Sequence, residues 1–164
     1  MEIIKSFKNA IKGIIYAIKN ERNMRIHTVA TFCVFIFSLF FNLNSEKYIL
    51  LILTCSIVMI CELVNSALEN LIDICATDYN SKAKAAKDIS AGAVLLSALM
   101  AFFVGVLIFK DVRGYINLWN FLCRFPWSIV PAAIVGICLY YYIFMGPAEI
   151  KNKIKSKIVK YFKK

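Results

Sequence analysis

The chain has 164 residues, of which 60% are hydrophobic, and a formal net charge of +10. A soluble domain of this length buries only part of its apolar surface, so the composition argues against an ordinary soluble fold and indicates a protein of the lipid bilayer. The charge would suit either nucleic acid or anionic lipid, and the positions of the basic residues decide between them.

Neither the cysteines nor the first residues point to a secreted or zinc-binding protein. The six cysteines form no CxxC pair, most lie inside apolar runs, and His27 is the only histidine. Free cysteines in such runs behave as small hydrophobes, so we expect neither a disulfide framework nor a zinc site. Residues 1–25 carry lysines and lack an apolar core followed by a small-residue cleavage site, so we expect no cleavable signal peptide.

The predicted elements are helices. Residues 3–18 place lysines on one arc and apolar residues on another, which is typical of a helix lying in the membrane interface; packing on a soluble partner is the alternative. Apolar stretches predict four spanning helices: 26–45, from 48 to beyond 61, 89–109 and 125–148, with a tight turn at 42–45 and a polar loop at 75–87. The predicted fold class is an all-α integral membrane protein with an N-terminal amphipathic interfacial helix, three core transmembrane helices and a fourth, C-terminal one.

The basic residues predict the orientation in the membrane. Sixteen of them lie in residues 1–27, in residues 75–88 and after the fourth span, and four lie in the other loops. By the positive-inside rule, both termini then face the cytoplasm in a multi-pass protein of the cell membrane. This distribution explains the charge without a nucleic-acid partner. The tail Lys151–Lys164 would attract anionic lipid or serve as a generic topology anchor.

The second span carries a polar stripe within an arc of about 100°, made up of Glu62, Asn65, Ser66, Glu69 and Asp73. Its charge-free part is only 14 residues long, so the helix must carry Glu62 into or near the bilayer; a solvated extension of the helix is the alternative. Ionisable residues at such depth usually mark a functional pathway. Glu69, nearer the headgroups, suits Mg²⁺ with phosphate, and the deeper Glu62 suits a general base on a lipid hydroxyl.

Further candidates flank the stripe. Glu21 and Arg25 precede the first span, and the segment after the stripe contains Asp78, Tyr79, Asn80, Lys82, Lys84, Lys87 and Asp88. Lysines there could neutralise phosphates, although a solvated loop explains Lys82 and Lys84 equally simply, and Asp88 could instead cap the third span. The chain has no Walker A loop or Rossmann glycine pattern, so any nucleotide site must be built from side chains at the membrane face.

At these residues the chain resembles the prokaryotic diacylglycerol kinase family. The resemblance covers about residues 5–109 and rests on Asn20-Glu21 with Arg25, on the block Glu62-Leu-Val-Asn65-Ser-Ala-Leu-Glu69-Asn-Leu-Ile-Asp73, on Asp78-Tyr79, and on Ala86-Lys87-Asp88 before Ala91-Gly-Ala-Val-Leu-Leu. Asn80 stands where many relatives have histidine, and the fourth span lies beyond the usual family core. A kinase-like membrane domain would thus occupy residues 1–110, and 111–164 would add a transmembrane helix with a basic tail.

The resemblance implies an ATP-dependent lipid kinase that uses Mg²⁺ and forms a homotrimer of three-span protomers with active sites shared between subunits. Glu62 would be the catalytic base, and Glu21 and Glu69 would hold the metal ions on ATP. The implied nucleotide-binding residues are Asn65, Asp73, Asp78, Tyr79, Asn80, Lys87 and Asp88. Asn23 and Arg25, with Glu62, would contact the lipid.

The lipid and the class of function stay open at this point. The segment Arg25-Ile26-His27 is similar to the undecaprenol kinase branch of the family, which favours undecaprenol over diacylglycerol as the acceptor. An ion or proton transporter would also explain acids inside a span, and would conduct without using ATP. A non-catalytic membrane scaffold would tolerate loss of the Glu62 carboxylate.

Overall fold

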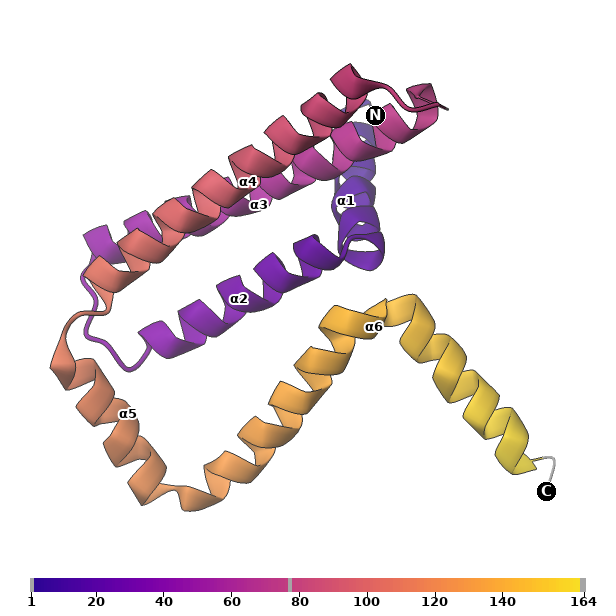
Figure 1. Cartoon of the computed structure of the whole chain (residues 1–164). Helices are drawn as coiled ribbons and strands as arrows, with labels where there is room; N and C mark the ends of the chain where they lie inside the picture. The colour runs from indigo at the N-terminus through magenta and orange to yellow at the C-terminus, as the bar shows by residue number, and fades with distance from the viewer. Residues whose placement is uncertain (1, 77, 163–164) are drawn as a thin grey trace. The chain divides into compact units, whose positions relative to one another are not determined.

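The computed structural model describes residues 2–76 and 78–162, and it is helical throughout these residues apart from short connections (Figure 1). The elements are α1 (Glu2–Asn20), α2 (Arg22–Ser38), α3 (Ser45–Cys75), α4 (Ser81–Ile108), α5 (Val112–Arg124), the 3₁₀ turn η1 (Pro126–Ser128) and α6 (Ile129–Phe162). The all-α prediction is confirmed, and α1 matches the amphipathic helix expected over 3–18.

Three helical segments are long and apolar enough to cross a bilayer within the described residues: Ser45–Cys75, Ser81–Ile108 and Pro126–Pro147. They correspond to the second, third and fourth predicted spans. The first predicted span, 26–45, differs from the structure, because α2 begins earlier and already ends at Ser38. Its 17 residues reach about 26 Å, at the short end of the roughly 17–25 residues that cross a hydrocarbon core of about 30 Å. The segment that follows is a tight turn, with the Phe41 N–H bonded to the Ser38 carbonyl at 3.0 Å.

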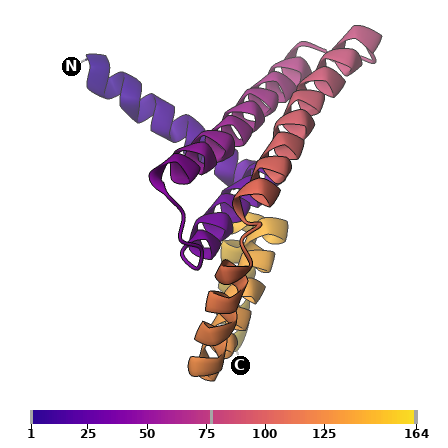
Figure 2. The ribbon, with the colours of Figure 1, turned by 90° about the vertical axis from the view of Figure 1, so that its left-hand side faces the viewer.

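Helices α3 and α4 form an antiparallel hairpin and lie side by side in both ribbon views (Figures 1 and 2). Asn44 caps α3 by accepting from the Lys47 N–H at 3.1 Å, and Asn80 caps α4 by accepting from the Lys82 N–H at 2.9 Å. Because α3 is continuous for 31 residues, the whole acidic stripe belongs to a spanning helix, as the sequence predicts.

Two predictions about the α3–α4 connection were wrong. The polar loop expected over 75–87 is much shorter, because α4 begins at Ser81 and places the lysines in its first two turns. Asp88 does not cap the third span, since Asn80 does so and Asp88 lies inside α4. The Asn80 side-chain oxygen accepts from two N–H groups of the first turn of α4. This cap stabilises a helix that begins at Ser81 over a longer loop.

Residues 110–124, expected to be a loop, contain α5 instead. Val112, Tyr115, Ile116 and Trp119 are exposed apolar residues spaced by three and four, the pattern of an amphipathic helix. Asp111 precedes the helix and accepts from the Arg113 N–H at 3.0 Å, a bond that lowers the pKa of the Asp111 carboxyl. The helical spacing of these residues is present in the sequence itself.

Contacts between residues divide the described part of the chain into two units. The first unit consists of the residues up to Val29 and those from Phe125 onward, and the second consists of Ala30–Arg124. The first holds α1, the start of α2 and α6; the second holds α3, α4 and α5. These are spatial groupings, and the predicted division at residues 110 and 111 follows the family resemblance and stays a prediction.

Candidate active site

The polar stripe on α3 runs from buried to exposed along the helix. The Glu62 side chain is 2% exposed, and Asn65 and Ser66 are also buried. One turn further Glu69 is half-buried, and Asp73 is exposed. The deeper carboxyl is thus buried on a spanning helix and the one nearer the helix end is wetter, while their roles as base and metal ligand stay predictions.

Asn65 connects this stripe to α4. Its Nδ2 donates to Oε1 of Glu69 at 3.0 Å, and its Oδ1 accepts from the Ser90 hydroxyl at 2.6 Å. Both ends of the buried amide are therefore satisfied, and the Glu69 carboxylate is held through one oxygen. Ser90 was not among the predicted residues, because a lone serine in an apolar helix gives no signal of its partner.

A second link joins the two helices nearer the connection. Lys87 on α4 forms an ion pair with Asp73 on α3. Their side chains are 35% and 67% exposed, so the pair contributes at most about 1 kcal/mol to stability. The structure thus brings together two of the predicted nucleotide-site residues, and it leaves a lysine ammonium close to the end of the acidic stripe.

The remaining predicted nucleotide residues lie around the connection between α3 and α4. Asp78 and Tyr79 are exposed, Tyr79 at 84%, and Asp88 is exposed on α4. Asn80 is different, because its side-chain oxygen accepts from the Lys82 and Ala83 N–H groups at 2.9 and 3.3 Å. This capping role accounts for an asparagine at the position where the resemblance leads one to expect histidine.

The other three predicted residues belong to the first unit. Glu21 lies between α1 and α2, where its N–H donates to the Ala17 carbonyl at 2.8 Å. Asn23 is exposed in the first turn of α2, whereas Arg25 is 6% exposed. Pairing of Glu21 with Glu69 in a metal site therefore stays a prediction, since the two residues belong to different units.

Among the described residues, no three His, Cys, Asp or Glu side chains stand close enough to hold a metal ion by themselves. Mg²⁺ is commonly held by only one or two carboxylates, with phosphate oxygens and water completing the shell. Glu69 fits that need, because Asn65 engages one of its oxygens and leaves the other for a cation at the half-buried end of the stripe.

An apolar groove of about 450 Å³ lies on the α3–α4 pair, beside the Asn65–Ser90 bond. It is lined by Ile60, Cys61, Val64, Asn65, Leu68, Ala86, Ile89, Ser90 and Ala93. Nearly all of its surface is hydrocarbon, and its two polar lining side chains, Asn65 and Ser90, are buried. The groove has the character needed for an alkyl or prenyl chain next to polar groups.

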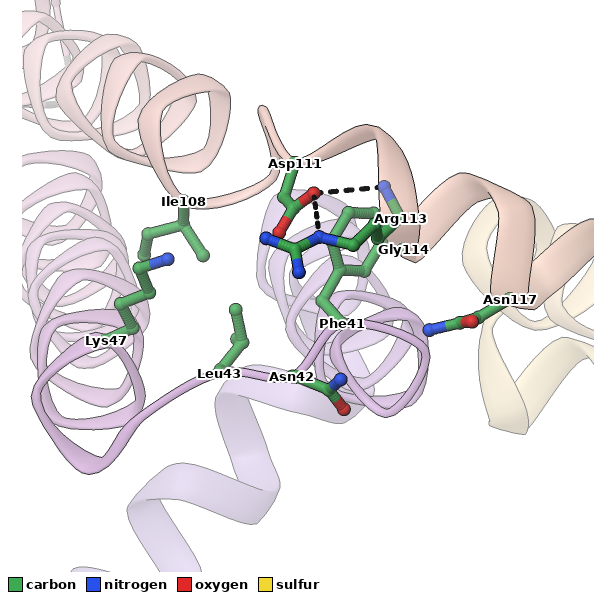
Figure 3. A pocket seen from close by; sticks show the side chains of 9 residues that line it. All are labelled: Phe41, Asn42, Leu43, Lys47, Ile108, Asp111, Arg113, Gly114 and Asn117. Atoms are coloured by element: carbon green, nitrogen blue, oxygen red, sulfur yellow. Dashed lines mark hydrogen bonds and ion pairs between the residues drawn. The ribbon is translucent and has the colours of Figure 1, made fainter.

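A second pocket, of about 250 Å³, lies at the opposite end of the hairpin (Figure 3). It is lined by Phe41, Asn42, Leu43, Lys47, Ile108, Asp111, Arg113, Gly114 and Asn117. Its one carboxylate, Asp111, is paired with Arg113 at 3.4 Å. Gly114 packs on the Phe41 ring so closely that a β-carbon there would lie 2.1 Å from it. The acidic groups of the stripe lie on the other half of the hairpin.

Comparison with known proteins places these features in a family. The sequence profile of prokaryotic diacylglycerol kinases matches residues 8–109. The chain belongs to the prokaryotic diacylglycerol kinase family. The match includes every candidate residue named above, from Glu21 to Asp88, and it stops before α5 and α6.

Individual relatives of the family differ in their named lipid. The chain is 41% identical to a diacylglycerol kinase of Synechocystis over 104 residues, which are 63% of this chain and 59% of that protein. It is 34% identical to an undecaprenol kinase of Bacillus subtilis over 105 residues, 64% of this chain and 85% of that protein. Identity to the diacylglycerol kinase of Escherichia coli K12 is 31% over 99 residues, 60% of this chain and 81% of that protein.

Proposed function

We propose that this protein transfers the γ-phosphoryl group of ATP to the hydroxyl of a membrane lipid alcohol. The observation that carries the proposal is the Glu62 carboxyl, buried on a spanning helix and followed by the wetter Glu69 about 10 Å further along the axis. A base within the apolar layer can reach a lipid hydroxyl, while a carboxylate nearer the headgroups can meet the nucleotide from the aqueous side.

In this mechanism the lipid hydroxyl lies against Glu62. The α3–α4 groove, whose lining includes Cys61 and Asn65 but not Glu62, would take the lipid chain. Glu62 takes the hydroxyl proton as the lipid oxygen attacks the γ-phosphorus in line, and ADP leaves. Asn65 keeps the Glu69 carboxylate oriented. Lys87, which Asp73 holds at the end of the stripe, offsets the negative charge on the phosphoryl oxygens. Mg²⁺ bound through Glu69, and in the predicted pair through Glu21, would neutralise the phosphate oxygens.

The acceptor that we favour is undecaprenol, with diacylglycerol second. The similarity of the Arg25-Ile26-His27 segment to the undecaprenol kinase branch supports this order, as does a match to 85% of the Bacillus subtilis undecaprenol kinase. The higher identity to the Synechocystis diacylglycerol kinase favours diacylglycerol instead. Both lipids present one primary hydroxyl, so the groove has to discriminate between their chains.

The assembly that we propose is a homotrimer in the cell membrane, with both termini and the active site on the cytoplasmic side. The uneven distribution of basic residues supports this orientation, because loops rich in lysine and arginine tend to stay on the cytoplasmic side of the membrane. ATP is a cytoplasmic metabolite, and the connection between α3 and α4, which carries the predicted nucleotide residues, would then lie in the cytoplasm.

The test is transfer of labelled γ-phosphate from ATP in mixed micelles that contain either undecaprenol or diacylglycerol, with Mg²⁺ present. Labelled undecaprenyl phosphate as the main product would support the favoured acceptor. Phosphatidic acid as the main product would assign the enzyme to diacylglycerol. No labelled lipid from folded protein would overturn the kinase proposal and favour ion transport through the acidic stripe.

A further inference from the structure

The pocket of about 250 Å³ in Figure 3 lies at the end of the α3–α4 hairpin that is remote from the acidic stripe. Lys47 in its lining and the exposed Asp73 are 26 residues apart on α3, which is about 39 Å along a straight helix axis. A bilayer with its head-group regions is about 40–45 Å thick. When Asp73 lies among the head groups of one membrane face, the pocket therefore lies among those of the other.

The inner wall of the pocket is built by close packing within the second unit. Gly114 on α5 is buried against the Phe41 ring, which is 4% exposed and leaves no room for a β-carbon. The Tyr115 ring packs on the same phenylalanine with 5.1 Å between ring centroids. Asn117 donates through Nδ2 to the Phe40 carbonyl at 3.0 Å. These contacts fix α5 against the turn that follows α2, so the pocket has a defined shape.

Two cationic side chains from different helices line the pocket. Lys47 from the first turn of α3 lies on one side, and Arg113 from α5 lies on the other (Figure 3). Oδ1 of Asp111 accepts from the Arg113 N–H at 3.0 Å and from its Nε at 3.4 Å, so Asp111 orients the guanidinium and offsets its charge. Within the described part of the chain, Lys47 forms no ion pair. The lining thus carries one net positive charge.

Helix α5 itself has the character of a helix in the membrane interface. Its exposed apolar residues include Val112, Ile116 and Trp119, and it follows the end of the spanning helix α4 after only three residues. Amphipathic helices with aromatic residues lie at the level of the head groups, with their apolar face toward the acyl chains. The pocket beside α5 is therefore bordered by lipid head groups.

We propose that this pocket binds the phosphodiester of a phospholipid from the membrane face opposite the acidic stripe, between Lys47 and Arg113. The one net positive charge of the lining matches the single negative charge of a phosphodiester, and the terminal nitrogens of the guanidinium form a fork that suits phosphate oxygens. The family profile ends at residue 109, so Arg113 and Gly114 lie beyond it. The bound phospholipid would fasten α5 to the family core, whether or not the protein transfers phosphate.

The test is photo-cross-linking of the full-length protein in bilayer nanodiscs that contain phosphatidylglycerol with a diazirine in its head group. A neutral glycolipid with the same acyl chains and the same diazirine is the comparison. We expect phosphatidylglycerol to label residues 42–47 and 111–117 about fivefold more strongly than the glycolipid, because only the former carries a charge that the pocket attracts. Equal labelling by the two lipids would overturn the inference. Loss of the label in excess inorganic phosphate would assign the pocket to a free anion and would overturn it as well.

Variants separate the pocket from general attraction of anionic lipid to a basic surface. Lys47→Gln and Arg113→Gln should each reduce labelling by phosphatidylglycerol about fivefold, since each removes one charge contact at the surface, and should leave labelling by the glycolipid unchanged. Lys110→Gln is the matched control, because Lys110 is exposed at the same end of the hairpin but does not line the pocket, and its effect should stay below about twofold. If Arg113→Gln loosens α5, Lys47→Gln still decides, as its side chain has no ion-pair partner to lose among the described residues. Equal losses in Lys47→Gln and Lys110→Gln, or no loss in Lys47→Gln, would overturn the inference.

Discussion

The Ser90 hydroxyl on α4 lies 2.6 Å from Oδ1 of Asn65 on α3, and the opposite end of the same amide holds Glu69 at 3.0 Å. A side chain on the third core helix is therefore linked, through one buried amide, to the carboxylate proposed for the metal. Because both ends of the amide are hydrogen-bonded, a substitution at Ser90 should alter the position of the Glu69 carboxylate.

Ser90→Ala should destabilise the hairpin and weaken nucleotide binding. Asn65 Oδ1 would stay buried without its donor, which costs about 1–3 kcal/mol, and the amide would no longer hold Glu69 in one position. Thermal unfolding in detergent and KM for MgATP measure the two effects. Ser97→Ala is the matched control, since Ser97 is also buried on α4 but bonds only to the Val94 carbonyl of its own helix. Equal effects of the two variants would contradict the linkage.

Glu62→Gln should remove the general base while it preserves the shape of the side chain. We expect kcat to fall by about 10²- to 10⁴-fold, the usual contribution of a positioned base, with little change in either KM. The labelled-phosphate assay in mixed micelles gives both values. Glu46→Gln, on the exposed first turn of the same helix, is the control and should behave as wild type. Substantial turnover in Glu62→Gln would remove Glu62 from this role.

Glu69→Gln should raise the Mg²⁺ concentration needed for half-maximal activity by about tenfold or more, because one anionic oxygen ligand becomes a neutral one. Its carbonyl oxygen can still accept from Asn65, so the melting temperature should change little. A Mg²⁺ titration of activity measures the effect. The assignment of Glu69 to the metal would fail if the titration curve coincided with that of wild type.

The proposed orientation predicts different labelling of two exposed cysteines. Cys75 ends α3 beside the proposed nucleotide site, and Cys123 lies in α5. In single-cysteine variants, a membrane-impermeant maleimide should label Cys123 in intact spheroplasts and should label Cys75 only after permeabilisation. Labelling of Cys75 before permeabilisation would reverse the topology and place the acidic stripe on the wrong side for ATP.

Much of this molecule could be predicted from the sequence. The apolar content required a bilayer, and the short charge-free run before Glu62 predicted that a spanning helix carries the acids, as α3 does. These features depend on composition and on the period of one helix, which local sequence specifies. The same period also marks α5, so this helix too is specified by the local sequence. The length of α2 was overestimated, because an apolar run does not show where its helix stops.

Which helices meet, and through which atoms, was decided only by the tertiary structure. Helical spacing places Asn65 on the polar face of α3, but it cannot name Ser90 as the partner 25 residues away. It shows that Pro147 interrupts a helix, but it cannot show that Arg25, 118 residues before Ile143 in the chain, takes the carbonyl that the proline leaves. The physical reason is that a buried polar group needs a hydrogen-bond partner. The sequence places the polar group on its helix, but only the packing of the helices brings a partner from elsewhere in the chain within hydrogen-bonding distance.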